Sequence, residues 1–235
     1  MRPLKCFIAS NRHGAYCVPA SSRHRPAAST IMQGYVWEAE TLAFLTDNCA
    51  GGDIIHAGTY FGDFLPALSE AVAPTGALVW AFEPCTENFR CAQITLILND
   101  IHNVTLARAA LGAGSGNALL CTGQPGRHAG GGSSVVTTRK RAGFTYEEVP
   151  VVAVDETVPG DRPVSILQLD VEKYEQQALA GALVTIRRWR PLLVLETLPA
   201  DAGWFAENIL ALGYEDAGAL DENRAFRAPI RDPRE

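Results

Sequence analysis

The chain has 235 residues, of which 47% are hydrophobic, and its formal net charge is −6. This length suits one α/β domain rather than two ordinary ones, and the hydrophobic fraction argues against disorder. The negative charge argues against a nucleic-acid partner, which would need a basic surface. No apolar stretch reaches the ~20 residues of a membrane span, so none is predicted.

The six cysteines are scattered along the chain and form no CxxC pair. Such a distribution is typical of reduced thiols and argues against a disulfide framework or a zinc site. The first ten residues also lack the long apolar segment of a signal peptide. We therefore expect a cytoplasmic protein.

Residues 1–34 are predicted to form an N-terminal appendage. Residues 6–10 and 15–19 fit a short hairpin. A basic arm overlaps it, because residues 2–25 contain no acidic residue and five basic ones: Arg2, Lys5, Arg12, Arg23 and Arg25. The arm could contact an acidic substrate or be a solvated terminus, and the appendage could pack on a neighbouring subunit of a homo-oligomer.

Residues 35–235 are predicted to form the main domain, which alternates strands and helices. We predict strands over residues 53–57, 77–83, 103–109, 164–170 and 191–197. We predict helices over residues 37–48, 62–73, 86–99, 173–189 and 202–212. Short apolar strands are typical of a parallel sheet covered by helices on both faces. The repeated βα units therefore predict a Rossmann-like α/β fold, which residues 213–227 close with a hairpin.

Residues 112–163 interrupt this alternation with a glycine-rich insertion. Glycines cluster at 112–116 and 126–132, and residues 149–154 fit a strand. We interpret the segment as short antiparallel strands that carry a mobile loop near the functional site. A plain surface excursion is the alternative, since glycine and serine also make flexible linkers.

The most informative motif is an apolar strand that ends in a turn containing Gly58 and Gly62. Glycine allows a sharp bend and a close approach of the backbone to a ligand. Glu83 ends the next strand, about 20 residues on, where a carboxylate binds ribose hydroxyls in nucleotide-binding folds. The turn lacks the GxGxxG pattern of a dinucleotide site. These residues predict a nucleoside-containing cofactor, although packing glycines and a solvated strand end remain alternatives.

Four segments give the chain its resemblance to FkbM-type S-adenosyl-L-methionine-dependent methyltransferases: residues 54–62, 82–89, 167–181 and 190–196. The resemblance implies a seven-stranded class I methyltransferase sheet with helices on both faces. Six strands would be parallel, and the last would be reversed near residues 225–228. The implied reaction is methylation of a hydroxyl on a small molecule, sugar or glycan, leaving S-adenosyl-L-homocysteine as product.

The resemblance also implies the residues of the cofactor site. Gly58, Thr59, Tyr60 and Gly62 would contact the methionine part, and Glu83 the ribose. The full predicted set is His56, Gly58, Thr59, Tyr60, Gly62, Asp63, Glu83, Pro84, Asn88, Ala109, Ala110, Leu111 and Asp170.

Two positions depart from the family pattern. His56 stands where the family usually has an acidic residue, and Lys173 stands where it usually has glycine. A neutral histidine can still accept a hydrogen bond from the ammonium group of the cofactor. Lys173 either helps to bind an acidic substrate or points into solvent.

Asp170 is the first candidate for the catalytic base, because it ends the fourth core strand, and His128 is the second. Asp170 could also cap the following helix, and His128 could simply be an exposed loop residue. A divalent cation beside Asp170 is conceivable, since related O-methyltransferases use one, but no metal is predicted. The alternatives to methyl transfer are a nicotinamide-dependent oxidoreductase and a catalytically silent cofactor-binding module.

Overall fold

The computed structural model describes residues 3–49, 51–136 and 140–229. Arg2 of the predicted basic arm and residues 137–139 of the predicted insertion lie outside the described residues. None of the described helices is long and apolar enough to cross a membrane.

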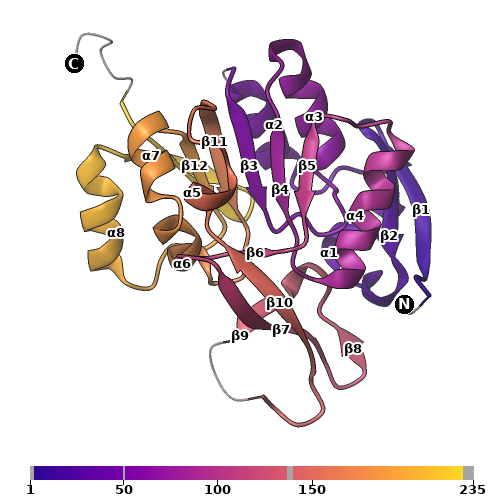
Figure 1. Cartoon of the computed structure of the whole chain (residues 1–235). Helices are drawn as coiled ribbons and strands as arrows, with labels where there is room; N and C mark the ends of the chain where they lie inside the picture. Colours follow the sequence, from indigo (N-terminus) through magenta and orange to yellow (C-terminus); the bar gives the residue numbers. More distant parts are fainter. Residues whose placement is uncertain (1–2, 50, 137–139, 230–235) are drawn as a thin grey trace.

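A seven-stranded sheet forms the centre of the molecule (Figure 1). Its strands, in spatial order, are β13 (Glu215–Leu220), β14 (Asn223–Arg227), β12 (Leu192–Leu195), β11 (Val164–Leu169), β3 (Asp53–Ala57), β4 (Val79–Phe82) and β5 (Val104–Ala107). The five strands from β12 to β5 pair in parallel. Only β14 is reversed, since it pairs antiparallel with both of its neighbours. The predicted class I sheet, with six strands in one direction and a reversed last strand, is confirmed.

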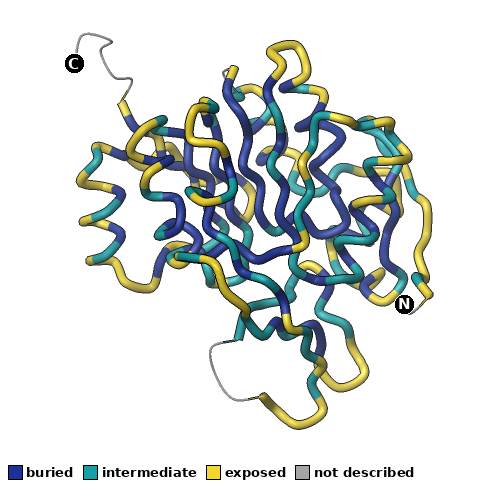
Figure 2. Tube along the Cα trace, viewed as in Figure 1, coloured by how far each residue is buried: buried dark blue, intermediate teal, exposed yellow. Residues whose placement is uncertain are grey.

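Each face of the sheet is covered by helices because side chains alternate along the strands. On β3, Ile54 packs against α2 (Ala39–Asn48) and α3 (Leu65–Val72), and Ile55 packs into the opposite apolar cluster. That second cluster includes residues of α5 (Val154–Thr157), α6 (Glu175–Ala180), α7 (Leu183–Trp189) and α8 (Ala202–Asn208). Figure 2 shows the consequence, a sheet whose central strands are buried along their length.

The predicted insertion forms a second sheet. Strands β6 (Ala110–Leu111), β10 (Thr145–Val152), β7 (Gly116–Gln124) and β8 (Arg127–His128) follow one another in space, and β9 (Ser134–Val136) also pairs with β7. All pairs are antiparallel except that of β6 with β10. The glycine-rich loop between β8 and β9 contains a short 3-10 helix, Gly130–Gly132. The expected short antiparallel strands are therefore present.

The predicted N-terminal hairpin is present as β1 (Cys6–Asn11) and β2 (Gly14–Pro19). It packs on α4 (Thr86–Leu98), where the Cys17 amide donates to Thr95 Oγ1 at 3.0 Å. The segment that follows the expected basic arm forms a helix, α1 (Pro26–Met32). Pro26 at its first position is a helix-start signal.

Three predicted helices differ from the structure, one of which, 202–212, is α8 (Ala202–Asn208) followed by a 3-10 helix, Leu210–Leu212. The segment 173–189 is two helices, because α6 ends before Gly181, where a Cβ atom would lie 1.9 Å from the carbonyl oxygen of Gly112. The first of them begins at Glu175 rather than at 173, because Glu172 and Lys173 have left-handed φ angles of 55° and 74°. Likewise, α3 begins at Leu65 rather than at 62, since Gly62 has φ 83°.

Candidate functional site

Two adjoining cavities lie where the central strands end. The first, here called the acidic cavity, is lined by Arg25, Pro26, Ala27, Trp37, Glu38, His56, Gly58, Tyr60, Asp63, Phe64, Gly131, Gln168, Asp170, Glu172, Glu196 and Glu222. The second, here called the apolar cavity, is lined by Ala57, Gly58, Phe82, Glu83, Pro84, Ala109, Ala110, Leu111, Leu120, Gly131, Ser133, Val135, Asp170, Val171 and Tyr174. They contain about 790 and 430 Å³ of empty space, including space open to solvent.

The turn after β3 forms part of the wall between the cavities. Gly58 has φ 86°, and a Cβ atom there would lie 1.8 Å from the carbonyl oxygen of Asp170. Only glycine can occupy such a position, so this residue sets how closely the ends of β3 and β11 approach. Gly58 and Asp170 line both cavities, which makes this contact their common border.

Glu83 is 4% exposed at the end of β4 and faces the apolar cavity. Its two carboxylate oxygens accept hydrogen bonds of 2.8 Å from the backbone amides of Tyr60 and Cys85. Burial raises the pKa of Glu83 to about 8, although these donors and Asn88 oppose the rise. Because each carboxylate oxygen has two acceptor positions, Glu83 retains capacity for a ligand hydroxyl.

His56 lies on β3 at the floor of the acidic cavity and is 3% exposed. Its Nδ1 is 2.5 Å from Oε1 of Gln168, and its ring stacks on Phe64 at a centroid distance of 5.7 Å. Because a carboxamide oxygen can only accept, Nδ1 carries the hydrogen and Nε2 keeps its lone pair. Nε2 is buried and has no hydrogen-bond partner among the residues that the structure describes. Burial lowers the pKa of His56 to about 4, so the ring is neutral at pH 7.

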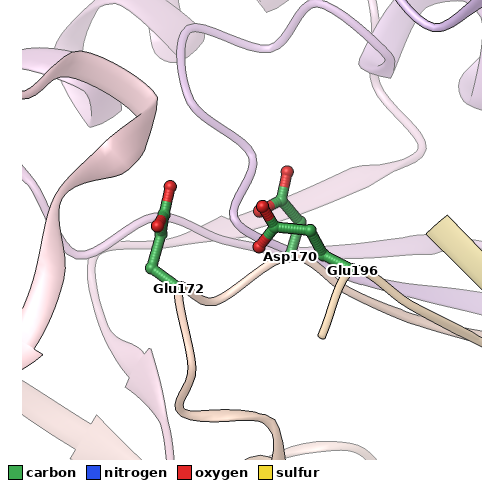
Figure 3. Close-up of side chains that lie close together, drawn as sticks. All are labelled: Asp170, Glu172 and Glu196. Atoms are coloured by element: carbon green, nitrogen blue, oxygen red, sulfur yellow. The ribbon is translucent and has the colours of Figure 1, made fainter. Parts of the chain in front are cut away.

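Three carboxylates converge at the ends of β11 and β12 (Figure 3). Asp170 follows β11, Glu172 lies two residues further on, and Glu196 follows β12. One oxygen from each lies within 4.8 Å of the others. Burial and the neighbouring Glu196 raise the pKa of Asp170 well above its ordinary value. Burial also raises the pKa of Glu172 to about 7.

Two further carboxylates, Glu38 and Asp63, lie on the other side of the acidic cavity. Burial raises the pKa of each to about 7, and the two groups repel one another. Glu38 Oε2 accepts a hydrogen bond of 2.7 Å from the Asn223 amide. The acidic cavity therefore collects six carboxylates, whereas Arg25 is its one arginine or lysine among the lining residues.

The N-terminal segment and the glycine-rich loop meet over Tyr60. The Tyr60 hydroxyl donates to Ser22 Oγ at 2.6 Å, and a Cβ atom on Gly130 would lie 2.8 Å from that hydroxyl oxygen. Asn88 Nδ2 donates to the carbonyl oxygen of Gly130 at 3.1 Å. The loop is thus held against the turn after β3, where its Gly131 lines both cavities.

The structure brings most of the predicted site residues to these cavities. His56, Tyr60 and Asp63 line the acidic one; Glu83, Pro84, Ala109, Ala110 and Leu111 line the apolar one; Gly58 and Asp170 line both. Thr59, Gly62 and Asn88 lie behind the walls and are not lining residues.

His128 is not brought to either cavity. Its Nδ1 accepts a hydrogen bond of 3.0 Å from the Gly130 amide, and its Nε2 is 3.4 Å from a carboxylate oxygen of Glu87. These two contacts give the ring a position within the glycine-rich loop, directed at α4.

The sequence reading did not assign several residues of the acidic cavity: Arg25, Trp37, Glu38 and Glu222. Trp37 and Glu38 precede α2, and Glu222 lies in the turn between β13 and β14. Glu38 and Glu222 reach the same cavity because the side chain of Asn223, the neighbour of Glu222, donates a hydrogen bond to Glu38, which lies 185 positions earlier in the sequence. Arg25 arrives through the helix start at Pro26. None of these positions carries a local motif that would have indicated its role.

Solved structures share this fold at low sequence identity. A methyltransferase FkbM from Methylobacillus flagellatus KT matches with a TM-score of 0.52 and 16% identity, over 75% of this chain and 43% of that chain. Trm5b from Pyrococcus abyssi matches with a TM-score of 0.52 and 12% identity, over 97% of this chain and 57% of that one. The chain thus spans less than two thirds of either structure.

Among curated proteins, no sequence matches the chain. The family model for the methyltransferase FkbM domain does match, over residues 56–222. That range includes the turn after β3, Glu83, the glycine-rich loop and all three converging carboxylates. The chain belongs to the FkbM methyltransferase family.

Proposed function

We propose that the chain transfers a methyl group from S-adenosyl-L-methionine to a hydroxyl oxygen of a small molecule, sugar or glycan. The observation that carries this proposal is the pair of cavities that share Gly58 and Asp170. An apolar cavity next to a charged one matches a cofactor whose adenosine end is planar and whose amino-acid end is ionic.

The apolar cavity fits the adenosine. Ala109, Ala110 and Leu111 follow β5 and are at most 6% exposed, so small and apolar groups form the surface for a ring. Glu83 in the same wall can accept hydrogen bonds from ribose hydroxyls.

The acidic cavity fits the amino-acid end and the acceptor. Nε2 of His56 is a buried acceptor with no partner, and an ammonium group would supply the hydrogen bond that it lacks. A buried acceptor left unpaired costs about 1–3 kcal/mol, so a ligand that pairs with it gains affinity. Arg25 in the same wall can bind the carboxylate of the cofactor.

Asp170 lies at the border of the cavities, where the two reactants would meet. The sulfonium of the cofactor supplies a methyl group that is already electrophilic, so the protein mainly aligns the attacking oxygen. An acceptor hydroxyl next to Asp170 could donate its hydrogen to this carboxylate and so be held for attack.

Calorimetry with S-adenosyl-L-homocysteine tests the cofactor site. The wild-type chain should bind with a stoichiometry of one, and Glu83→Ala should weaken binding by about 1–3 kcal/mol, or roughly 5- to 150-fold. Glu70→Ala, an exposed position on α3, is the matched control and should bind as the wild type does. Since Glu83 also holds two backbone amides, circular dichroism must confirm that the variant is folded. Equal affinity in both variants would remove Glu83 from the ribose site.

Transfer of a labelled methyl group to a panel of acceptors tests the reaction itself. The panel should contain alcohols, sugars, glycans, amines and RNA. We expect label in the alcohol or sugar fraction, and Asp170→Asn should lower the rate by about 100-fold or more while binding of S-adenosyl-L-homocysteine persists. Labelling of amines or RNA in place of hydroxyls would contradict the proposed acceptor class.

A further inference from the structure

We propose that a further cavity, at the opposite end of the central sheet from the acidic and apolar cavities, binds an oxyanion of the phosphate class. Arg188, Arg190 and Arg227 line it together with Asn48 and Trp189, and we call it the arginine cavity. It contains about 1170 Å³ of empty space, including space open to solvent. None of its lining residues lines the acidic or the apolar cavity, so it can bind a ligand whether or not the chain transfers methyl groups.

The arginine cavity lies where the parallel strands begin, at the edge of the sheet that is farther from the second sheet in Figure 1. Among its lining residues, Gly52 precedes β3, Pro163 precedes β11, and Leu192 begins β12. Gly58 and Asp170, which border the acidic and apolar cavities, follow the other ends of β3 and β11. A strand rises about 3.3 Å per residue, so the five residues of β3 separate the two edges by roughly 17 Å. A small ligand at one edge therefore does not touch the other.

The charge of the arginine cavity is opposite to that of the chain, whose formal net charge is −6. Three arginines line the cavity, and its described lining residues include no aspartate or glutamate. The acidic cavity has the reverse composition, with six carboxylates and one arginine. A concave surface that carries charges of one sign concentrates ions of the other sign, so the arginine cavity favours an anion.

The contacts of these arginines leave most of their donors without a protein acceptor. Within the described part of the chain, none of the three forms an ion pair with a carboxylate. The guanidinium of Arg188 lies over the ring of Trp189, with 4.9 Å between its central carbon and the ring centroid. Nη2 of Arg227 donates to Oδ1 of Asn48 at 2.6 Å. Since a guanidinium carries five N–H donors, both side chains retain donors for an anion.

Arg190 supplies the observation that points most directly to a ligand. Its Nη1 donates to the carbonyl oxygen of Leu212. Its Nε is buried and has no hydrogen-bond partner among the residues that the structure describes. A buried donor without an acceptor destabilises the folded chain, so an oxyanion beside Arg190 would supply a hydrogen bond that the described protein atoms do not.

The three arginines converge from two elements of the fold. Arg188 lies in the last turn of α7 and Arg190 follows that helix, where the helix dipole favours cations. This local effect does not account for Arg227, which is the last residue of β14. The antiparallel pairing of β14 with β12 places Arg227 beside the start of β12, two residues after Arg190. The cluster is therefore a product of strand pairing as well as of the helix end.

Three guanidinium groups favour an anion with more than one charge and more than two acceptor oxygens. A guanidinium binds phosphate through two parallel hydrogen bonds, whereas a monocarboxylate has only two oxygens to share among three arginines. Val164, Leu192 and Ala228 also line the cavity and provide apolar surface for an organic group. The ligand class is therefore phosphate or a phosphate monoester, which share the same anionic group.

Calorimetry of the full chain with inorganic phosphate, in a buffer without other oxyanions and at constant ionic strength, tests the cavity. We expect saturable binding with a stoichiometry of one. Arg227→Gln should weaken binding at least about ten-fold, because one of three charged partners is lost. Arg187→Gln is the matched control, since it removes the same charge from the exposed face of α7 outside the cavity, and should change the affinity less than about three-fold.

Two further ligands define the bound group. Glycerol phosphate carries the anion as an ester, and acetate carries one charge on two oxygens. Tighter binding of glycerol phosphate than of inorganic phosphate would assign the cavity to an ester, and the reverse order would assign it to the free anion. The proposal is overturned if neither phosphate compound binds saturably, if acetate binds as tightly as they do, or if Arg227→Gln and Arg187→Gln lose affinity equally.

Thermal unfolding separates phosphate binding from folding defects. Arg227 is exposed and its hydrogen bond goes to the side chain of Asn48, so Arg227→Gln should fold, which circular dichroism checks. Phosphate should raise the melting temperatures of the wild type and Arg187→Gln, and raise that of Arg227→Gln clearly less. Equal stabilisation of all three chains by phosphate would contradict the site.

Discussion

The acidic cavity and the apolar cavity share a border but differ in what forms their walls. The apolar cavity contains one carboxylate besides Asp170, and that group, Glu83, is held by two backbone amides. The acidic cavity contains six carboxylates, and the described structure gives none of them an ion-pair partner. Glu83 is thus paired within its own wall, whereas neighbouring acids raise the pKa values of Asp63 and Asp170 in the acidic cavity.

We interpret this difference as two different modes of ligand binding. A wall whose polar groups are already paired can bind an adenosine through shape and a few added hydrogen bonds. A wall of closely spaced acids costs stability until protons, an ammonium group or a metal ion enter. Ligand binding at the acidic cavity should therefore depend strongly on pH, and ligand binding at the apolar cavity should depend mainly on the size of the side chains that line it.

The largest expected effect is the pH dependence of stability at Asp63. Its pKa in the folded chain is about 7, raised by burial and by Glu38, against 3.8 for an ordinary aspartate. The folded chain therefore binds more protons than the unfolded chain between about pH 4 and 7, and the free energy of unfolding falls as pH rises through this range. Asp63→Asn removes this pH dependence. Between pH 5 and pH 8, the free energy of unfolding of the variant should therefore rise by about 3 kcal/mol relative to that of the wild type.

Urea denaturation of the cofactor-free chain at the two pH values measures the Asp63 effect. Glu70→Gln, on the exposed surface of α3, is the control and should show the same pH dependence as the wild type. If the free energies of unfolding of Asp63→Asn and the wild type differ by the same amount at both pH values, protonation of Asp63 does not contribute to stability.

The next effect concerns volume in the apolar cavity. Ala110 is 6% exposed in its wall, and a phenyl ring in place of its methyl group would occupy the space assigned to adenine. Ala110→Phe should weaken binding of S-adenosyl-L-homocysteine at least 100-fold, or about 2.7 kcal/mol. Ala43→Phe, at an exposed position on α2, is the size-matched control. If calorimetry finds unchanged affinity in a folded Ala110→Phe, the cofactor does not use this cavity.

The smallest effect lies just outside both cavities, at Lys173. This residue is exposed and has φ 74°, a conformation that favours glycine. Lys173→Gly should therefore raise the free energy of unfolding by about 0.5–1 kcal/mol and leave the affinity for S-adenosyl-L-homocysteine unchanged. Arg187→Gly, on the exposed face of α7, should instead lower the free energy of unfolding by about 1 kcal/mol. A weaker cofactor affinity in Lys173→Gly would give the lysine a binding role.

The local sequence predicted the core elements well where a pattern repeats within one segment. The apolar strands around Ile54 and Ile166, the hairpin 6–19 and the reversed last strand are all present. The break between α6 and α7 was missed, because Gly181 is required by the backbone of Gly112, about 70 positions away. The start of α6 was misplaced for a local reason, the left-handed backbone at Glu172 and Lys173.

Most of the predicted cofactor residues lie at the two cavities, whereas several other residues of the acidic cavity were not predicted. Glycines of a strand-to-helix turn and an acid at the next strand end form a motif within one βαβ unit. Of the 13 predicted cofactor residues, three do not line a cavity: Thr59 and Gly62 lie in that turn, and Asn88 lies on α4, where it donates to Glu83 and to the carbonyl oxygen of Gly130. The domain limits at residues 34 and 112–163 stay predictions.

The sequence by itself determined which residues end the strands, because alternating burial and turn-forming glycines are properties of short segments. The apolar pattern therefore predicted a parallel sheet with Asp170 at a strand end, and the resemblance to the family implied its seven strands. Only the tertiary structure decided that Glu172 and Glu196 meet Asp170, and that Glu38 and Glu222 close the far side. The physical reason is that strand order and loop packing, which bring distant carboxylates within a few ångströms, arise from the burial of the whole core and leave no mark on any one segment.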